Sequence, residues 1–323
     1  MNFRLLTSLA ISLGMFLPGV SLGNPTQVYK GTAHDAFYGL CVSGSQQIAV
    51  GDAGLILESH DAGGSWAALK PFTENALLDV SCVGDVSLIV GQEGAIYRRT
   101  TETYLPVTSN TNERLLSVSE ISSNGLGFAV GGFGTVLRTT DSGLSWEPLT
   151  LDWPKLTNDF FEPHLYDVDV SDAGIVTIVG EFEMVIQSAN QGDTWETTHI
   201  GEASLFGLSL HANGVGFAVG QNGKVLKTAN GGQTWKHIDS PGIGILLNVW
   251  TSGSGDVLVT GIRNMLQSTD SGAKWRQINK GDLSTSWYQG LSVIDGGSLA
   301  GGSVLLAGHG GSLIKLQLDK NKN

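Results

Sequence analysis

The chain has 323 residues, of which 41% are hydrophobic, 45 are glycine and only 8 are proline. This composition excludes a disordered polar chain and indicates many tight turns between buried strands, while the length admits one large all-β domain or two smaller domains. The formal net charge of −12 repels phosphate backbones and anionic lipid, so we expect no nucleic-acid partner.

The first element along the chain is an apolar segment. Residues 1–23 contain Arg4 near their start, an apolar run that ends at Leu17, and the small-residue sequence Ser21-Leu22-Gly23. This order is typical of a cleaved signal peptide, so we expect residues 24–323 to form one exported, periplasmic domain. The alternative is an uncleaved membrane anchor, although the run is shorter than the ~20 apolar residues that a membrane span needs.

A hairpin motif of the form Val-Gly-x-x-Gly, with weaker variants, repeats along the rest of the chain. The steps between its first glycines are 40, 40, 49, 40, 41 and 47 residues, and a period near 40 is that of one four-stranded propeller blade. Because glycine supplies the positive φ of a tight reversal, we expect each copy to join the second and third strands of a blade. The first glycines are Gly51, Gly91, Gly131, Gly180, Gly220, Gly261 and Gly308.

A short apolar segment before each hairpin is expected to be the innermost strand of the blade. Its third residue is small or short and polar, which fits strands that converge near a central axis. These residues are Gly39, Asp79, Ser117, Asp167, Gly207, Asn248 and Gly290. The pattern predicts an all-β, seven-bladed β-propeller. The seventh repeat lacks an outermost strand, and we expect residues 26–30 to supply it and so close the ring.

A second motif, Ser/Thr-x-Asp/Asn-x-Gly-x-Ser/Thr-Trp, follows five of the hairpins, with Lys274 replacing the hydroxyl residue in the last copy. We interpret it as a structural turn, because the Asp or Asn side chain accepts bonds from backbone N–H groups and the Trp packs between blades. A catalytic or metal-binding role is disfavoured, since two of the five copies carry Asn. The five acceptor residues are Asp61, Asp141, Asn190, Asn230 and Asp270.

These five motifs match the Asp-box of sialidase-type (BNR) repeat families. Seven such blades behind a signal peptide resemble the photosystem II assembly and stability factor family, which has relatives in bacteria without photosynthesis. The resemblance spans essentially residues 24–323 and implies a non-enzymatic propeller without a cofactor, which binds a protein partner in the envelope or membrane. Members in photosynthetic cells are thought to use an arginine-rich patch. The six arginines after residue 23 lie in an acidic background, so neither the patch nor the photosynthetic role is carried over.

The rival interpretation is a glycan-binding or sialidase-like hydrolase propeller. Sialidases need an arginine cluster, a Tyr nucleophile paired with Glu, and an acid/base Asp, but the expected inner strands contain no arginine. Neutral-glycan hydrolases need only two carboxylates, so Asp79, Asp167 and Asp169 keep that alternative open. The seven histidines show no close metal-ligand spacing, and we expect no metal site.

The two longest repeat steps indicate insertions in crossings between blades, at residues 151–164 and 281–288. In a four-stranded meander these crossings share a face with the hairpins, and loops that depart from a rigid repeat often carry function. Exposed aromatic side chains are typical interface anchors, although such side chains can also fold back and cap the core. The predicted partner-binding residues are Trp153, Phe160, Phe161, Phe133, Phe182, Trp287 and Tyr288.

Cys41 and Cys82 are the only cysteines. They fall at similar heights on the expected inner strands of adjacent blades, and their opposite parity lets both side chains enter the same gap. Packed sheets are ~10 Å apart, whereas a disulfide needs Cα atoms within roughly 7 Å. The sequence therefore leaves two alternatives, a disulfide or two buried thiols.

Overall fold

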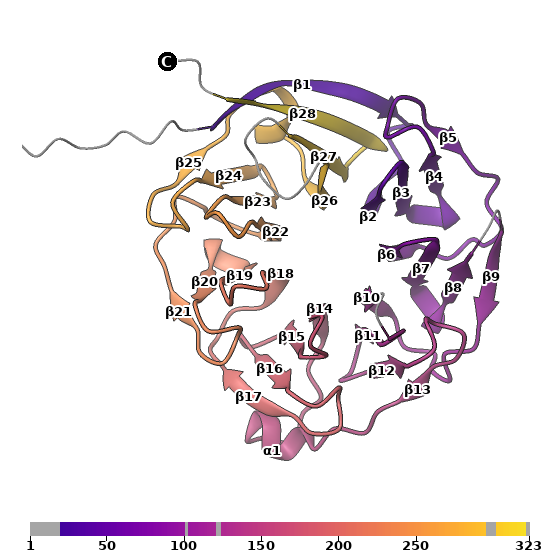
Figure 1. Ribbon diagram of the computed structural model, residues 1–323, viewed down its shortest axis with the longest axis vertical. Coiled ribbons are helices and arrows are strands. Elements are labelled where there is room, and N and C mark those ends of the chain that lie inside the picture. The colour runs from indigo at the N-terminus through magenta and orange to yellow at the C-terminus, as the bar shows by residue number, and fades with distance from the viewer. Residues whose placement is uncertain (1–19, 101–102, 121–123, 295–301, 321–323) are drawn as a thin grey trace, which may run out of the picture.

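The computed structural model describes residues 20–100, 103–120, 124–294 and 302–320. They form seven four-stranded antiparallel sheets around a central axis, which confirms the predicted seven-bladed β-propeller (Figure 1). Residues 1–19 of the expected signal peptide lie outside the described residues. Among the residues described, no helix has the length and apolar character needed to cross a membrane.

Blades 1 to 6 take their strands in chain order from the axis outward. Blades 1 to 3 consist of β2 (Phe37–Ser43), β3 (Gln46–Gly51), β4 (Ile56–Ser59) and β5 (Ala67–Ala68); β6 (Leu77–Val83), β7 (Val86–Gly91), β8 (Ile96–Arg99) and β9 (Tyr104–Val107); and β10 (Leu115–Glu120), β11 (Gly127–Gly131), β12 (Val136–Thr139) and β13 (Glu147–Pro148).

Blades 4 to 6 consist of β14 (Leu165–Val170), β15 (Val176–Gly180), β16 (Val185–Ser188) and β17 (Glu196–His199); β18 (Leu205–Leu210), β19 (Gly216–Gly220), β20 (Val225–Thr228) and β21 (Lys236–His237); and β22 (Leu246–Thr251), β23 (Val257–Gly261), β24 (Asn264–Ser268) and β25 (Arg276–Gln277). The only α-helix of the described chain is the short α1 (Trp153–Thr157), and the four 3₁₀ turns described are η1 (Asp52–Gly54), η2 (Gln92–Gly94), η3 (Gln221–Gly223) and η4 (Gly281–Ser284).

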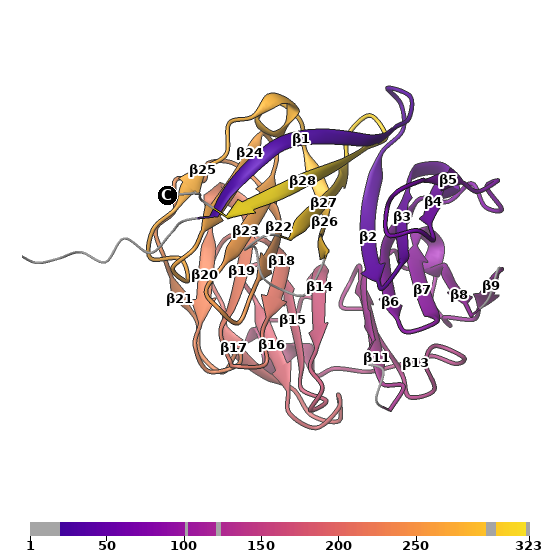
Figure 2. The same cartoon turned by 45° about the horizontal axis from the view of Figure 1, so that its top comes forward.

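Blade 7 is closed by the N-terminal strand, as predicted. Its order from the axis is β26 (Tyr288–Ile294), β27 (Ser303–Gly308), β28 (Ser312–Lys320) and β1 (Val20–Lys30), and Figure 2 shows β1 and β28 side by side. The strand is longer than expected, because it begins at Val20 and not at Thr26. The predicted cleavage sequence therefore lies within β1, where Ser21 pairs with Asp319 and Leu22 with Leu318.

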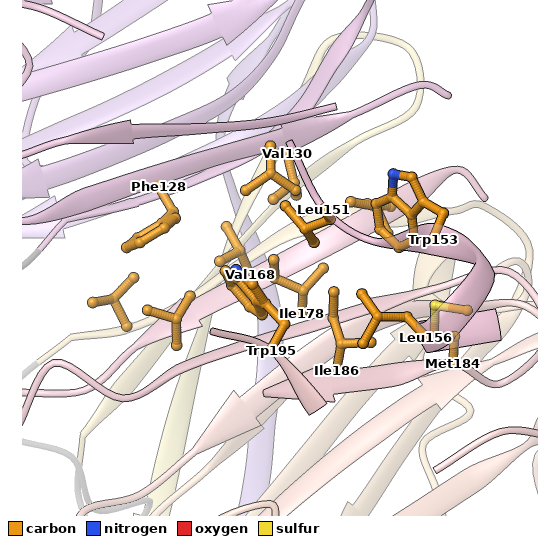
Figure 3. Close-up of a cluster of buried hydrophobic side chains, with 14 of the residues drawn as sticks. Phe128, Val130, Leu151, Trp153, Leu156, Val168, Ile178, Met184, Ile186 and Trp195 are labelled. Atoms are coloured by element: carbon orange, nitrogen blue, oxygen red, sulfur yellow. The ribbon is translucent and has the colours of Figure 1, made fainter. Parts of the chain in front are cut away.

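The core is divided into seven apolar clusters, each built mainly from the facing sides of two adjacent blades. Between blades 3 and 4, for example, Phe128 and Val130 pack against Ile178 and Ile186 (Figure 3). Both faces of each sheet are covered in this way. This arrangement explains why the second strands are continuous apolar runs and not alternating ones.

The first glycine of the hairpin motif serves a different purpose from the predicted one. Gly51 has a φ of −165°, which is extended backbone, and a Cβ atom there would overlap the carbonyl oxygen of Ala36. The other six first glycines approach the residue before their inner strand in the same way. The positive φ values fall at the tip instead, at Ala53 and Gly54 in blade 1. Close backbone approach therefore requires the first glycine.

Cys41 and Cys82 are joined by a disulfide that links β2 to β6, with their Cα atoms 5.7 Å apart. The average spacing of packed sheets would have prevented this bond. The inner strands of neighbouring blades converge toward the axis, however, and bring the two Cα atoms within bonding range.

All five Asp-box sequences form the same hydrogen-bonded turn. In blade 1, Asp61 Oδ1 accepts from the Ser65 backbone N–H at 2.8 Å, and the Ser59 hydroxyl accepts from the Gly63 N–H at 2.8 Å. Asp141, Asn190, Asn230 and Asp270 each accept the equivalent N–H bond at 2.8–3.0 Å. The Trp that ends each motif packs in the cluster between its own blade and the preceding one.

Candidate functional site

The hairpins between second and third strands share one face of the ring with the crossings between blades. We call this surface the hairpin face. Backbone hydrogen bonds tie the two kinds of loop together, as where the Gly134 N–H of the blade 3 hairpin donates to the Pro163 carbonyl of the next crossing at 2.8 Å. The turns between first and second strands lie on the opposite face with the Asp-box turns, since the Ala62 N–H donates to the Ser45 carbonyl. The predicted placement of the loops is therefore correct.

Exposed apolar side chains gather on the hairpin face. Among the described residues nine large hydrophobic side chains are exposed, and only Leu105 and Leu144 lie elsewhere. Such a concentration on one face is typical of an interaction surface. The sequence interpretation identified Phe133, Phe160 and Phe182. It missed Phe72 and the three isoleucines, which come from short crossings and from one hairpin without an unusual length. The seven residues on this face are Phe72, Phe133, Phe160, Phe182, Ile200, Ile243 and Ile262.

Two of these phenylalanines occupy a backbone conformation that bulky residues avoid. Phe133 and Phe182 stand at hairpin tips with φ of 49° and 60°, in the left-handed region where Gly, Asn and Asp are favoured. The equivalent tip of blade 5 carries Asn222, with φ of 57°. The fold therefore does not require an aromatic residue at this position, and the exposed rings cost backbone strain without filling the core.

Two of the predicted partner-binding residues are wrong, because Trp153 and Tyr288 are buried. Trp153 begins α1, and its ring packs beneath the blade 3 hairpin, where a Cβ atom on Gly134 would press against the indole (Figure 3). Tyr288 begins β26 and packs in the cluster between blades 6 and 7. In both cases the aromatic residue folds back onto the core, which was the alternative that the sequence left open.

The other predicted aromatic residues divide into exposed and half-buried ones. Phe160 is 91% exposed and Phe133 is 60% exposed. Phe161 is half-buried and packs on Phe182, with 4.7 Å between ring centroids. Trp287 is also half-buried and stacks on Tyr38 at the mouth of the axial channel, with 6.0 Å between centroids. Phe133, Phe160 and Phe182 therefore remain as candidate anchors.

A groove on the same face runs from Phe133 to the axis. It consists of two adjoining cavities of about 620 and 360 Å³, and Arg114 and Tyr166 line both. The outer cavity reaches Phe133, and the inner one ends at the channel mouth beside Phe206. The Arg114 side chain is exposed and forms no ion pair with any residue that the structure describes. The groove thus combines aromatic walls with the Arg114 cation and with carboxylates at its margin, those of Glu93, Glu113 and Asp52.

The inner-strand carboxylates form a structural belt below the groove. Asp79 Oδ2 accepts from the Val118 N–H at 3.0 Å, and Asp167 Oδ2 accepts from the Leu208 N–H at 2.7 Å, so each aspartate joins its strand to the next blade. The Ser117 hydroxyl lies 3.0 Å from Asp79 Oδ2 and 2.8 Å from Asp167 Oδ1. These backbone bonds occupy the carboxylate oxygens that a hydrolase would direct at its substrate.

The same environment shifts the ionisation of these carboxyls. Burial raises the pKa of Asp79 and of Asp169 to about 6. Burial, together with the negative charge of Asp79, raises the pKa of Asp167 to about 7. The Ser117 hydroxyl has a single proton, so both of its contacts are hydrogen bonds only when one of the two carboxyls is protonated. Within the described residues, no cluster of three or more His, Cys, Asp and Glu side chains could hold a metal ion.

Comparisons with known proteins agree on the fold. No protein-family description and no curated protein sequence matches the chain. Among solved structures, YCF48 from Cyanidioschyzon merolae superposes with a TM-score of 0.73 at 18% identity, over 91% of this chain and 99% of that one. A YCF48 bound to a D1 peptide gives 0.69 at 17% identity, over 92% and 97%.

Propellers of other activities are equally similar. Virginiamycin B lyase from Staphylococcus aureus gives a TM-score of 0.73 at 14% identity, over 93% of this chain and all of that one. At such identities the likeness establishes the architecture alone. The protein belongs to the class of seven-bladed β-propellers, and its role must be argued from its own surface.

Proposed function

We propose that the protein is a non-enzymatic, exported propeller that binds a protein partner of the cell envelope or membrane through its hairpin face. The observation that carries this proposal is the pair of exposed phenylalanines at positive φ. The backbone is strained at both tips, yet the two rings lie outside the apolar clusters of the core, where Phe133 contacts only His164 and Phe182 only Phe161 among the ring systems described. The groove beside Phe133 supplies a concave surface with aromatic walls. A YCF48 structure with a bound D1 peptide supports this role by analogy.

The test is photocrosslinking in living cells, with a photoreactive amino acid placed at position 133, 160 or 182. We expect crosslinks to a discrete protein at these positions and none at 105 or 144, which are similarly exposed but lie off the hairpin face. The variant F133N/F160S/F182N should lower the crosslink yield at a fourth site, Ile243, by ~10-fold. Its melting temperature should change by less than about 2 °C, because asparagine suits the two tips.

A hydrolase would give a different result when the purified protein is tested for activity. The alternative predicts release of sugars from a panel of polysaccharides, with a loss of activity in D79N, D167N or D169N. Crosslinks that are equally strong at positions 105 and 133, together with such an activity, would contradict the proposed binding role.

A further inference from the structure

One polar position recurs between neighbouring blades on the Asp-box side. In blades 2 to 5, a polar residue on the third strand donates a hydrogen bond to a backbone carbonyl in the Asp-box turn of the next blade. In blades 3 to 5 this residue directly precedes the Asp-box of its own blade, whereas blade 2 has no Asp-box. This contact fixes the donor's head group in the junction between the two blades. The four pairs are Arg98 to Ser142 at 2.6 Å, Arg138 to Gln191 at 2.9 Å, Gln187 to Gly231 at 2.7 Å, and Lys227 to Ser271 at 2.6 Å.

Between blades 3 and 4 this position is a complete ion-pair network. Arg138 lies opposite Glu147 in the strand register, and their charged groups are 2.7 Å apart. On the other side, Arg138 Nη1 lies 2.7 Å from Asp193 of the blade 4 turn. The guanidinium is thus held between two carboxylates. Their oxygens mark where this junction accommodates negative charge.

Between blades 5 and 6 the two carboxylates are replaced. Lys227 takes the place of Arg138, and the residue opposite it in the register is Lys236, where blade 3 has Glu147. The turn position of Asp193 is occupied by Ala273, and the next residue is Lys274, where the other four Asp-boxes have Ser or Thr.

Three lysines therefore belong to this junction. Lys227 donates to the Ser271 carbonyl of the blade 6 turn and lies over the Phe217 ring, Lys236 stands opposite it in the strand register, and Lys274 belongs to the same turn as Ser271. Like charges directly opposite each other in a sheet are destabilising, so the Lys227 and Lys236 pair brings the blade no stability. Neither Lys236 nor Lys274 forms an ion pair with a carboxylate in the described parts of the chain, and both are exposed. The acidic residue of the same turn is Asp270, whose Oδ1 accepts from the Lys274 N–H and the Ser268 hydroxyl. Its carboxylate forms no ion pair with the Lys274 ammonium group in the described residues.

We infer that the junction between blades 5 and 6 binds a phosphate-class oxyanion, whose oxygens take the places that the Glu147 and Asp193 carboxylates take around Arg138. A tetrahedral dianion presents several acceptors to three ammonium groups, and charge-assisted bonds of this type are strong. The net charge of −12 does not prevent it, because at physiological ionic strength charges beyond ~8 Å are largely screened. The anion is either free phosphate or the phosphate of a lipid headgroup.

The test restores the blade 3 and 4 pattern in the variant K236E/A273D and measures inorganic phosphate binding by calorimetry at constant ionic strength. We expect the wild-type protein to bind and the variant to lose at least ~10-fold in affinity. The melting temperature of the variant in chloride should equal or exceed that of the wild type, since Lys227 regains two partners. The control K70E/A33D changes the net charge equally at exposed sites in or beside blade 1 and should bind like the wild type.

Two further measurements complete the test. The reciprocal variant E147K/D193A should gain phosphate binding between blades 3 and 4. Sedimentation with phosphatidylglycerol vesicles, compared with phosphatidylcholine vesicles, distinguishes a lipid headgroup from free phosphate as the source. The inference is overturned if the wild type binds neither phosphate nor anionic vesicles, or if K236E/A273D binds as well as the wild type. It does not depend on the hairpin face, so either proposal can fail alone.

Discussion

At the scale of single residues, the belt of inner-strand side chains links the propeller's geometry to its pH response. Asp167 accepts backbone bonds from its own strand and from blade 5, and burial raises its pKa to about 7. An aspartate in an unfolded chain has a pKa near 3.9. Between these two values the folded protein binds more protons than the unfolded one, so stability falls as the pH rises from about 4 to about 7.

We therefore expect Asp167→Asn to flatten this part of the stability profile. At pH 8 the variant should be more stable than the wild type by on the order of 1 kcal/mol, or roughly 2–4 °C in melting temperature, and at pH 4 the two should be alike. Thermal unfolding between pH 4 and 8 measures the effect. The control is Asp61→Asn. Hydrogen bonds lower the pKa of Asp61 to about 2. The contribution of the Asp61 carboxylate to stability is therefore lost only below about pH 4, outside the range that is measured. An unchanged slope in Asp167→Asn would contradict the assignment.

At the scale of strands and turns, the parts of the fold that could be predicted from the sequence were those that repeat from blade to blade. The hairpins, inner strands and Asp-box turns recur in register, so each copy supports the others, and their positions were right. The crossings occur once each and offer no second copy for comparison. For that reason, nothing in the sequence separates the buried Trp153 from the exposed Phe160, seven residues later. The donors before the Asp-boxes, such as Arg138, could have been found by aligning the five copies, because all five have a long polar residue directly before the motif: Glu58, Arg138, Gln187, Lys227 and Gln267.

The disulfide between β2 and β6 is expected to stabilise the ring through its unfolded state. It closes a loop of 41 residues, and removing it in C41A/C82A should lower the free energy of unfolding by roughly 3–4 kcal/mol. Urea unfolding of the variant, the oxidised wild type and the reduced wild type measures this difference. The reduced wild type should be about as stable as the variant. Thiol titration of the unfolded, unreduced protein should find no free thiol. Two titratable thiols in protein purified from an oxidising compartment would show that the bond is absent.

At the scale of the whole molecule, closure depends on one pairing between the two ends of the described chain. Eight residues of β1 pair with β28, and without β1 the edge of β28 would be open to other chains. A chain that starts at residue 31 should therefore dimerise or aggregate, and its melting temperature should fall by roughly 10 °C or more. A chain that starts at residue 20 is the control. Light scattering that finds both chains monomeric and equally stable would refute this role of β1.

The same pairing fixes the order of events during synthesis. The ribosome makes β1 before any other described strand, whereas its partner β28 is made last. Until about 280 further residues have been added, β1 has no neighbour with which to form its sheet. Ring closure must bring together parts of the chain separated by nearly its full length, which is the kind of contact that forms slowly. The nascent chain thus stays open at one end until β28 has been made, and the last blade becomes complete only after β28 has left the ribosome.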